Sequence, residues 1–177
     1  VSMLKEREKE EYIATIRSVL EDTQELSSIT ESLLELNKIS LNDYQSSFKI
    51  HRVDEILWES RSLIQKLHDG YKVIVDTQKM PDDEELLEIK ADDKLILTAF
   101  KNLMENACKF SPNKTAHVQL SIAKGQIKIA FKNEGKGIPA SDLPYIFQPF
   151  YRAENTAASK GYGIGLSLVE RIIQLRS

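Results

Sequence analysis

Asn102-Leu-Met-Glu-Asn106-Ala-Cys-Lys109-Phe110 is the stretch of sequence that decides the fold. The surrounding sequence predicts a strong helix over residues 93–110, which Asp92 or Asp93 can cap. Asn102 and Asn106 lie four residues apart on one face of that helix, and Lys109 follows three residues later. Two amide oxygens and an ammonium group in one stripe suit a magnesium-bound polyphosphate, because Mg2+ prefers oxygen ligands and keeps several waters. A partly exposed polar face that binds no ligand is the commoner meaning of such residues, and it stays open at this point.

The segments on either side of this helix predict the rest of the fold. A β-hairpin follows it, with apolar residues that alternate with polar ones over 118–122 and 127–131 and a turn at Lys124-Gly125. Before it we expect a short strand at 48–50, a helix over 53–68 that Gly70 ends, and strands over 71–76 and 86–90. The predicted inner stripe of that earlier helix consists of Ile56, Leu57, Ser60, Leu63, Ile64 and Leu67. The fold class predicted from this order is α+β, a two-layer α/β sandwich in which helices cover one face of a mixed sheet.

The first forty residues predict one long helix. Its apolar residues recur at threes and fours, and there is no Pro or Gly before residue 70. The apolar face consists of Ile13, Ile16, Leu20, Leu26, Ile29, Leu33, Leu36 and Ile39. We expect this face to pack on a partner helix from a second chain; the alternative is a single amphipathic helix that lies on the following domain. Leu41-Asn42-Asp43 breaks the pattern, so the predicted domains are 1–42 and 45–177.

Composition excludes several classes of function. The 177 residues carry a net charge of -3, which gives no electrostatic reason to expect a nucleic-acid partner. No apolar run approaches the roughly 20 residues that a membrane span needs. The single cysteine, Cys108, fits a reducing compartment and rules out a structural zinc site built on several cysteines.

Two glycine-rich loops are the other candidates for ligand binding. The first, Asn133-Glu-Gly135-Lys-Gly137-Ile138, leaves a strand directly, and its glycines let the backbone approach a flat ligand. The second, Gly161-Tyr-Gly163-Ile-Gly165-Leu166, opens the last helix, where unpaired N–H groups attract phosphate. It lacks the Gly-Lys-Ser/Thr ending of a P-loop. Each loop taken alone is also compatible with an ordinary turn.

The order of these motifs, with Ile146-Phe-Gln-Pro-Phe150-Tyr151-Arg152 between the two loops, resembles the histidine-kinase branch of the gyrase, chaperone, kinase and mismatch-repair ATPase superfamily. The resemblance covers residues 45–176, and residues 3–40 resemble the second helix of that family's dimerisation and phosphotransfer hairpin. It implies an ATP-dependent protein histidine kinase that passes phosphate through a histidine to an aspartate of a response regulator.

The resemblance also implies roles for individual residues. Asn102 and Asn106 would bind Mg2+, Lys109 the phosphates, and the ring of Phe110 would lie against adenine. The base would also contact the first glycine loop, and the phosphates would contact the second, under a lid spanning about residues 151–162 that Phe147 and Phe150 anchor. The full set of expected nucleotide-binding residues is Asn102, Asn106, Lys109, Phe110, Asn133, Gly135, Gly137, Ile138, Phe150, Tyr151, Arg152, Gly161, Gly163, Gly165 and Leu166.

The chain departs from the family pattern at several points. Asn133 stands where the family has an aspartate, which predicts weaker adenine binding and tighter binding after Asn133→Asp. Asn102 stands where the superfamily's ATPases carry an acid that activates water, which favours phosphoryl transfer over hydrolysis. None of His51, His68 and His117 fits the acceptor motif, so we expect this chain to begin after the acceptor.

These departures leave two rival hypotheses beside the kinase, a nucleotide-binding module without transfer and a dimerisation scaffold. The family's usual further pair of strands is also absent after the last helix, so we expect a C-terminally truncated domain of marginal stability. Expected partners are ATP, a phosphotransfer helix of the same or a second chain, a response regulator and a second copy. The expected location is the cytoplasmic portion of a membrane-anchored protein.

Overall fold

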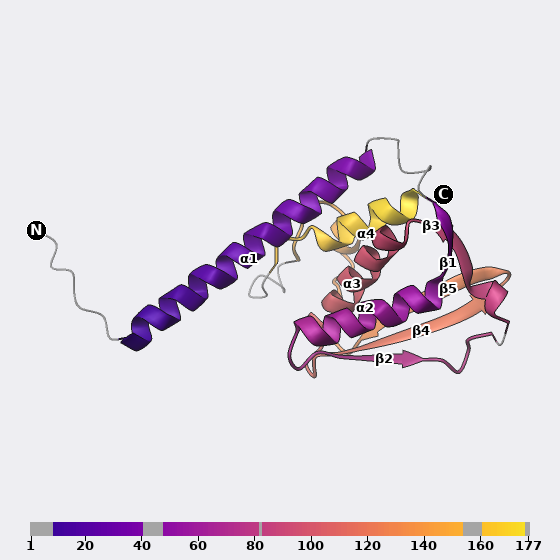
Figure 1. Cartoon of the computed structure of the whole chain (residues 1–177), viewed down its shortest axis with the longest axis horizontal. Helices are drawn as coiled ribbons and strands as arrows, with labels where there is room; N and C mark the ends of the chain where they lie inside the picture. The colour runs from indigo at the N-terminus through magenta and orange to yellow at the C-terminus, as the bar shows by residue number, and fades with distance from the viewer. Residues whose placement is uncertain (1–8, 41–47, 82, 154–160, 176–177) are drawn as a thin grey trace, which may run out of the picture.

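A computed structural model describes residues 9–40, 48–81, 83–153 and 161–175 of the chain (Figure 1). Helices and strands interleave along it as predicted. The elements are α1 (Lys9–Ser40), β1 (Lys49–Arg52), α2 (Val53–Leu67), β2 (Lys72–Asp76), η2 (Glu84–Leu87), β3 (Glu88–Ala91), α3 (Asp93–Lys109), β4 (Thr115–Ala123), β5 (Gln126–Asn133), η3 (Leu143–Tyr145) and α4 (Gly165–Gln174). The predicted break at residues 41–43 lies outside the described residues.

The main sheet has three strands in the order β2-β4-β5. Strands β2 and β4 are parallel, and β4 and β5 form the predicted antiparallel hairpin, so the sheet is mixed. At the hairpin turn both Lys124 and Gly125 have positive φ, 53° and 73°, which is the backbone that matches the twist of the two strands. A separate antiparallel pair, β1 and β3, was not predicted as a sheet of its own.

Helices α2 and α3 cover one face of the main sheet and α4 packs on α3, which confirms the two-layer fold (Figure 1). The core is formed by alternate residues of β4, namely Ala116, Val118 and Leu120, and by the inner faces of the helices. Within the predicted stripe of α2, Leu57 and Ile64 are fully buried. Leu67 was wrongly placed in that stripe: it is 61% exposed, because α2 ends at this residue.

Helix α4 packs on α3. Its apolar face lies against the core: Ile164, Leu168, Val169 and Ile172 are buried, and Leu175 packs against the core. The helix begins at Gly165, within the second glycine loop. Helix α3 therefore lies between α2 and α4 and contacts both.

Helix α1 lies alongside α4 (Figure 1), and several of its described apolar side chains are exposed. Ile16 is 66% exposed, Leu20 57% and Leu26 60%. Among the described residues, no helix combines the length and the apolar content that crossing a lipid bilayer requires.

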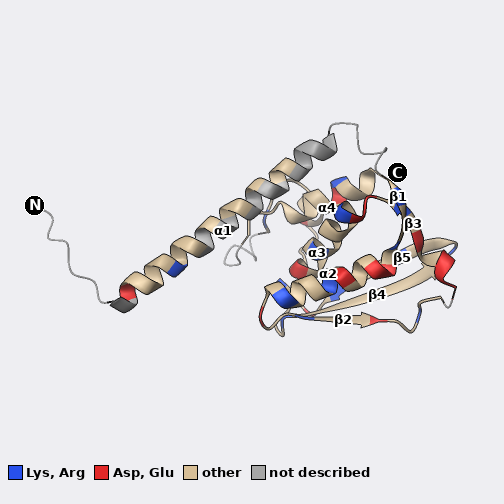
Figure 2. Ribbon diagram, in the orientation of Figure 1, with Lys and Arg blue, Asp and Glu red and all other residues tan. Residues whose placement is uncertain are grey.

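Acidic side chains gather where α2, η2 and β3 meet (Figure 2). Arg52 bridges two of them: its Nη2 lies 2.7 Å from the Asp54 carboxylate, and its Nη1 pairs with Glu84. This cation joins the start of α2 to η2, so the small sheet is fastened to the main body of the fold.

Candidate functional site

The site is built on helix α3. Its N-terminus is capped by Asp92, whose Oδ1 accepts a hydrogen bond of 3.1 Å from the Leu95 amide. The face toward the core is buried and consists of Leu95, Ile96, Ala99, Phe100, Met104, Ala107 and Cys108. Asn102, Asn106 and Lys109 are half-buried along the remaining stripe. The core side therefore fixes the rotation of α3 and presents the three predicted polar side chains together.

Asn102 faces the start of α4. Its Nδ2 donates to the Thr98 carbonyl at 2.9 Å, so its Oδ1 points toward Gly165. A Cβ at Gly165 would lie 2.6 Å from that oxygen, closer than any real Cβ contact. The second glycine loop thus approaches α3 at a position where only glycine fits.

Lys109 lies near the other end of the same loop. A Cβ at Gly161 would lie 2.9 Å from its Nζ, which also sits 4.9 Å from the centroid of the Phe110 ring. The ammonium group is thereby placed between the second glycine loop and the C-terminal end of α3.

The first glycine loop contacts the C-terminal end of α3. A Cβ at Gly135 would lie 2.3 Å from the Phe110 carbonyl oxygen, which accepts a hydrogen bond of 3.3 Å from Asn133 Nδ2. The Phe110 ring is 37% exposed. The end of β5 and α3 are therefore in direct contact beside an accessible aromatic ring.

Phe150 and Tyr151, which precede the second glycine loop in the sequence, contact that loop directly. The Phe150 amide donates to the Gly163 carbonyl at 3.0 Å, and a Cβ at Gly163 would lie 2.3 Å from the Tyr151 carbonyl oxygen. Tyr151 packs against Tyr145 with ring centroids 5.6 Å apart, whereas the Phe150 ring is 59% exposed. The two ends of the predicted lid are therefore joined, and its middle lies outside the described residues.

The structure thus brings Asn102, Lys109, Phe110, Asn133, Gly135, Gly161 and Gly165 together through direct contacts, with Asn106 on the same helix face. Phe150, Tyr151 and Gly163 contact one another at the ends of the lid, and the remaining predicted residues differ in their surroundings. A Cβ at Gly137 would meet nothing within 4 Å, Ile138 is 47% exposed, Arg152 is exposed and Leu166 is half-buried. Among the described residues, no cluster of three or more His, Cys, Asp or Glu side chains could hold a metal ion. Any Mg2+ here would depend on amide oxygens and phosphate.

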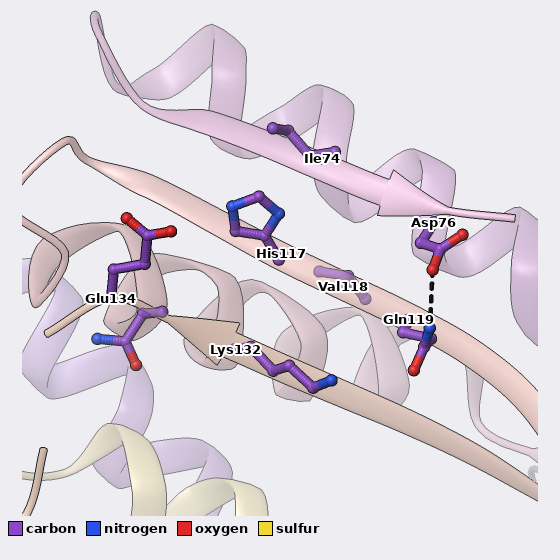
Figure 3. Close-up of a pocket in the computed structure, with 8 residues that line it drawn as sticks. Ile74, Asp76, His117, Val118, Gln119, Lys132 and Glu134 are labelled. Carbon is purple, nitrogen blue, oxygen red and sulfur yellow. Dashed lines mark hydrogen bonds between the residues drawn. The ribbon is translucent and has the colours of Figure 1, made fainter.

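A cavity of about 460 Å³ lies on the opposite face of the sheet (Figure 3). Its lining residues are Ile74, Asp76, His117, Val118, Gln119, Lys132, Asn133 and Glu134. Gln119 Nε2 donates to the Asp76 carboxylate at 2.7 Å; the backbone N–H of Gln78 and this bond lower the pKa of Asp76. Only Asn133 belongs both to this cavity and to the predicted site.

Two polar groups near α3 were not recognised from the sequence. Glu105 is half-buried with its Oε1 3.2 Å from His68 Nε2, and His68 stacks on Tyr71 with ring centroids 4.7 Å apart. Asn113 forms hydrogen bonds within the turn after α3 and to Glu134. The Ser111-Pro-Asn113 run is typical of such a turn and could have indicated it.

Comparisons with known proteins agree with this geometry. The family model for histidine kinase-, DNA gyrase B- and HSP90-like ATPases matches residues 91–177. The signal transduction histidine-protein kinase ArlS of Staphylococcus aureus (strain USA300) is 33% identical over 160 residues, which is 88% of this chain and 34% of ArlS. The chain thus spans about a third of the length of the curated relatives it matches.

Two solved structures share the fold. The Acinetobacter baumannii histidine kinase AdeS superposes with a TM-score of 0.69 at 18% identity, covering 98% of this chain and 76% of that one. A mycobacterial sensor histidine kinase, MprB, gives a TM-score of 0.60 at 22% identity, covering 72% and 79%. Residues 91–177 therefore belong to the histidine kinase-, DNA gyrase B- and HSP90-like ATPase family, and the chain as a whole is similar to the corresponding part of a histidine-protein kinase.

Proposed function

We propose that this chain binds ATP with Mg2+ between the polar stripe of α3 and the two glycine loops. One observation carries the proposal: a Cβ at Gly135 would overlap the Phe110 carbonyl and a Cβ at Gly165 would overlap the Asn102 amide, while Gly161 lies beside the Lys109 ammonium group. Two loops far apart in the sequence converge on one helix face at positions without side chains. Such an arrangement suits a ligand held by backbone groups and a few polar side chains.

The residues divide between the two ends of the nucleotide. At the base end, the Phe110 ring packs against adenine, Asn133 Oδ1 accepts from the exocyclic amine, and Gly135, Gly137 and Ile138 provide backbone contacts. At the phosphate end, Lys109 and the N–H groups at the start of α4 neutralise charge. The phosphate end consists of Lys109, Gly161, Gly163, Gly165 and Leu166, with Phe150, Tyr151 and Arg152 from the lid.

The amide oxygens of Asn106 and Asn102 would hold Mg2+, which would neutralise phosphate charge when bound. The reaction is transfer of the γ-phosphoryl group to a histidine nitrogen, followed by relay to an aspartate of a response regulator. Asn102 supports transfer over hydrolysis, because an amide does not accept a proton from water near neutral pH. Catalysis by this domain therefore consists of positioning and charge neutralisation.

The organisation of the longer protein follows from the same proposal. Residues 1–42 form part of the dimerisation and phosphotransfer hairpin, and residues 45–177 form the catalytic domain. The exposed apolar side chains on α1 support pairing with a helix of a second copy. The acceptor histidine belongs to that hairpin, in the same or the second chain, within the cytoplasmic portion of a membrane-anchored sensor.

Calorimetric titration with the non-hydrolysable analogue AMPPNP, with and without Mg2+, tests the binding proposal. We expect binding that Mg2+ strengthens and that Lys109→Ala weakens about tenfold, because a charged hydrogen bond is worth roughly 1.5–3 kcal/mol. Lys94→Ala is the matched control, since it removes the same charge from an exposed position at the far end of α3. Absence of binding, or equal weakening by both variants, would contradict the proposal.

Phosphoryl transfer is tested by adding a phosphotransfer hairpin to this chain. Labelled ATP is mixed with this chain and a phosphotransfer hairpin that carries the acceptor histidine. An acid-labile label on the hairpin is expected for a kinase. Binding of AMPPNP without any transfer would favour the nucleotide-binding module.

A further inference from the structure

The turn between α3 and β4 is organised by the side chain of Asn113. Its Oδ1 accepts from the Ser111 hydroxyl at 2.6 Å and from the Thr115 amide at 3.0 Å. The Thr115 hydroxyl donates in turn to the Asn113 carbonyl at 3.1 Å. Ser111 and Thr115 are buried, whereas Asn113 is exposed. These hydrogen bonds fix the conformation of the turn. The Asn113 Nδ2 group takes part in none of them and points away from the turn.

That amide reaches the end of strand β5. Asn113 Nδ2 donates to Glu134 Oε2 at 3.4 Å, and one residue earlier Asn133 Nδ2 donates to the Phe110 carbonyl at 3.3 Å. Both Asn133 and Glu134 line the cavity on the outer side of the sheet (Figure 3), and Asn133 also reaches back to the end of α3 through its Nδ2. The end of α3 and the turn after it thus hold two successive residues where β5 ends, which restricts how this part of the chain can move.

We propose that Asn113 is a positioning residue for the nucleotide site: by holding Glu134, it orients Asn133 and Gly135 toward the base. This inference rests on the proposed function. Asn113 itself is on the outer side of the turn and does not contact the nucleotide. Its effect is on the base end of the site, because Gly135 contacts the Phe110 carbonyl, whereas the second glycine loop contacts the side chains of Asn102 and Lys109.

Asn113→Asp is the sharpest perturbation. It keeps the two hydrogen bonds that Oδ1 accepts, and it replaces the donor to Glu134 with a like charge. The double variant Asn113→Asp/Glu134→Gln reverses the polarity of the pair, because the new amide donates to the new carboxylate. Competition against a fluorescent ATP analogue then gives dissociation constants for AMPPNP, which uses both ends of the site, and for inorganic tripolyphosphate, which uses only the phosphate end.

We expect Asn113→Asp to weaken AMPPNP binding about fivefold, the factor that loss of one hydrogen bond gives, and to leave tripolyphosphate binding unchanged. The double variant restores AMPPNP binding. Unchanged AMPPNP affinity, equal weakening of both probes, or failure of the double variant to restore binding would overturn the inference.

The rate of amide hydrogen exchange at residues 133–136, measured without nucleotide, tests the inference independently of binding. Exchange should be faster in Asn113→Asp than in the unaltered chain and the double variant, and equal rates would overturn the inference. If the unaltered chain bound neither probe, the proposed function would fail, and the exchange rates would still decide whether Asn113 orients the end of β5.

Discussion

At the residue scale, the site depends on glycines, which have no Cβ atom to obstruct the close approach of neighbouring groups. Gly165 stands at the first position of α4, where alanine would favour the helix by roughly 1 kcal/mol. The glycine is nevertheless required for the observed packing, because a Cβ there would lie 2.6 Å from Asn102 Oδ1. Local preference for helix and the close approach to α3 are in conflict at this residue, which is typical of a functional position.

Gly165→Ala should separate these two effects. We expect it to displace the Asn102 side chain and weaken Mg2+-dependent AMPPNP binding about tenfold, since overpacking of this kind costs roughly 1–3 kcal/mol. Calorimetry with and without Mg2+ measures the change. Gly125→Ala is the control: its Cβ would meet nothing within 4 Å, and the strain from the positive φ of 73° falls on the hairpin turn, so it should lower stability and leave affinity unchanged. The prediction fails if Gly165→Ala binds as the unaltered chain does.

Asn133→Asp should tighten ATP binding. A charged acceptor contributes roughly 1.5–3 kcal/mol against roughly 0.5–1.5 kcal/mol for a neutral one. The variant also gives up the hydrogen bond to the Phe110 carbonyl, so we expect a gain below about tenfold. Asn133→Ala, which loses both interactions, should bind more weakly. Titration with AMPPNP measures both variants, and unchanged or weaker binding by Asn133→Asp would contradict this expectation.

At the element scale, α1 differs from the other helices because several of its apolar side chains are exposed, although the helix lies against α4. Among the described side chains of α1, those of Ile16, Leu20 and Leu26 are each more than half exposed. Exposed apolar residues that recur along a helix mark a surface for another helix. These side chains are the basis for the proposed pairing of α1 with a second copy of the chain.

Ile16→Asn combined with Leu20→Asn should shift the chain toward monomer. The two changes place polar groups in the centre of the apolar face, where they would oppose helix pairing. Sedimentation velocity at several concentrations measures the effect. Arg17→Asn, at an exposed polar position on the same turn of α1, is the control and should sediment as the unaltered chain does. Equal masses for all three chains would argue against pairing through this face.

The sequence predicted elements best where periodic patterns were long. Helix α3 and the β4–β5 hairpin were placed to within a few residues, because burial of one face repeats along each of them. The strand expected from residue 86 begins at Glu88 instead. Residues 84–87 form the 3-10 turn η2, which Asp83 caps by accepting from the Glu85 amide at 3.1 Å. A short local turn of this kind leaves no periodic pattern.

The composition of the site could be predicted only in part. The polar stripe of α3 and the glycine loops follow from spacing along the chain. The pairing of Gly165 with Asn102, or of Asn113 with Glu134, depends on how distant segments pack, and no single segment specifies it. Contacts between elements therefore had to come from the structure.

At the scale of the whole molecule, nucleotide binding and stability should be linked. The proposed ligand contacts α3, β5 and the start of α4, which are separate in sequence and joined in one core. At a hundredfold excess over Kd, a ligand that binds only the folded state adds about 2.7 kcal/mol, which corresponds to about 5–10 °C in Tm for a chain of this size. Thermal melts with AMPPNP and Mg2+ should show this rise, and a smaller one for Lys109→Ala. Identical Tm values with and without nucleotide would contradict it.

The burial of Cys108 makes selective dye attachment simple. Its side chain is fully buried, and burial raises the pKa of the thiol, so it stays protonated and shielded from maleimides at neutral pH. Because the chain has no other cysteine, Lys128→Cys on the outer face of the sheet would create one reactive thiol without removal of the native one. A fluorophore there could follow the catalytic domain as it approaches a phosphotransfer helix.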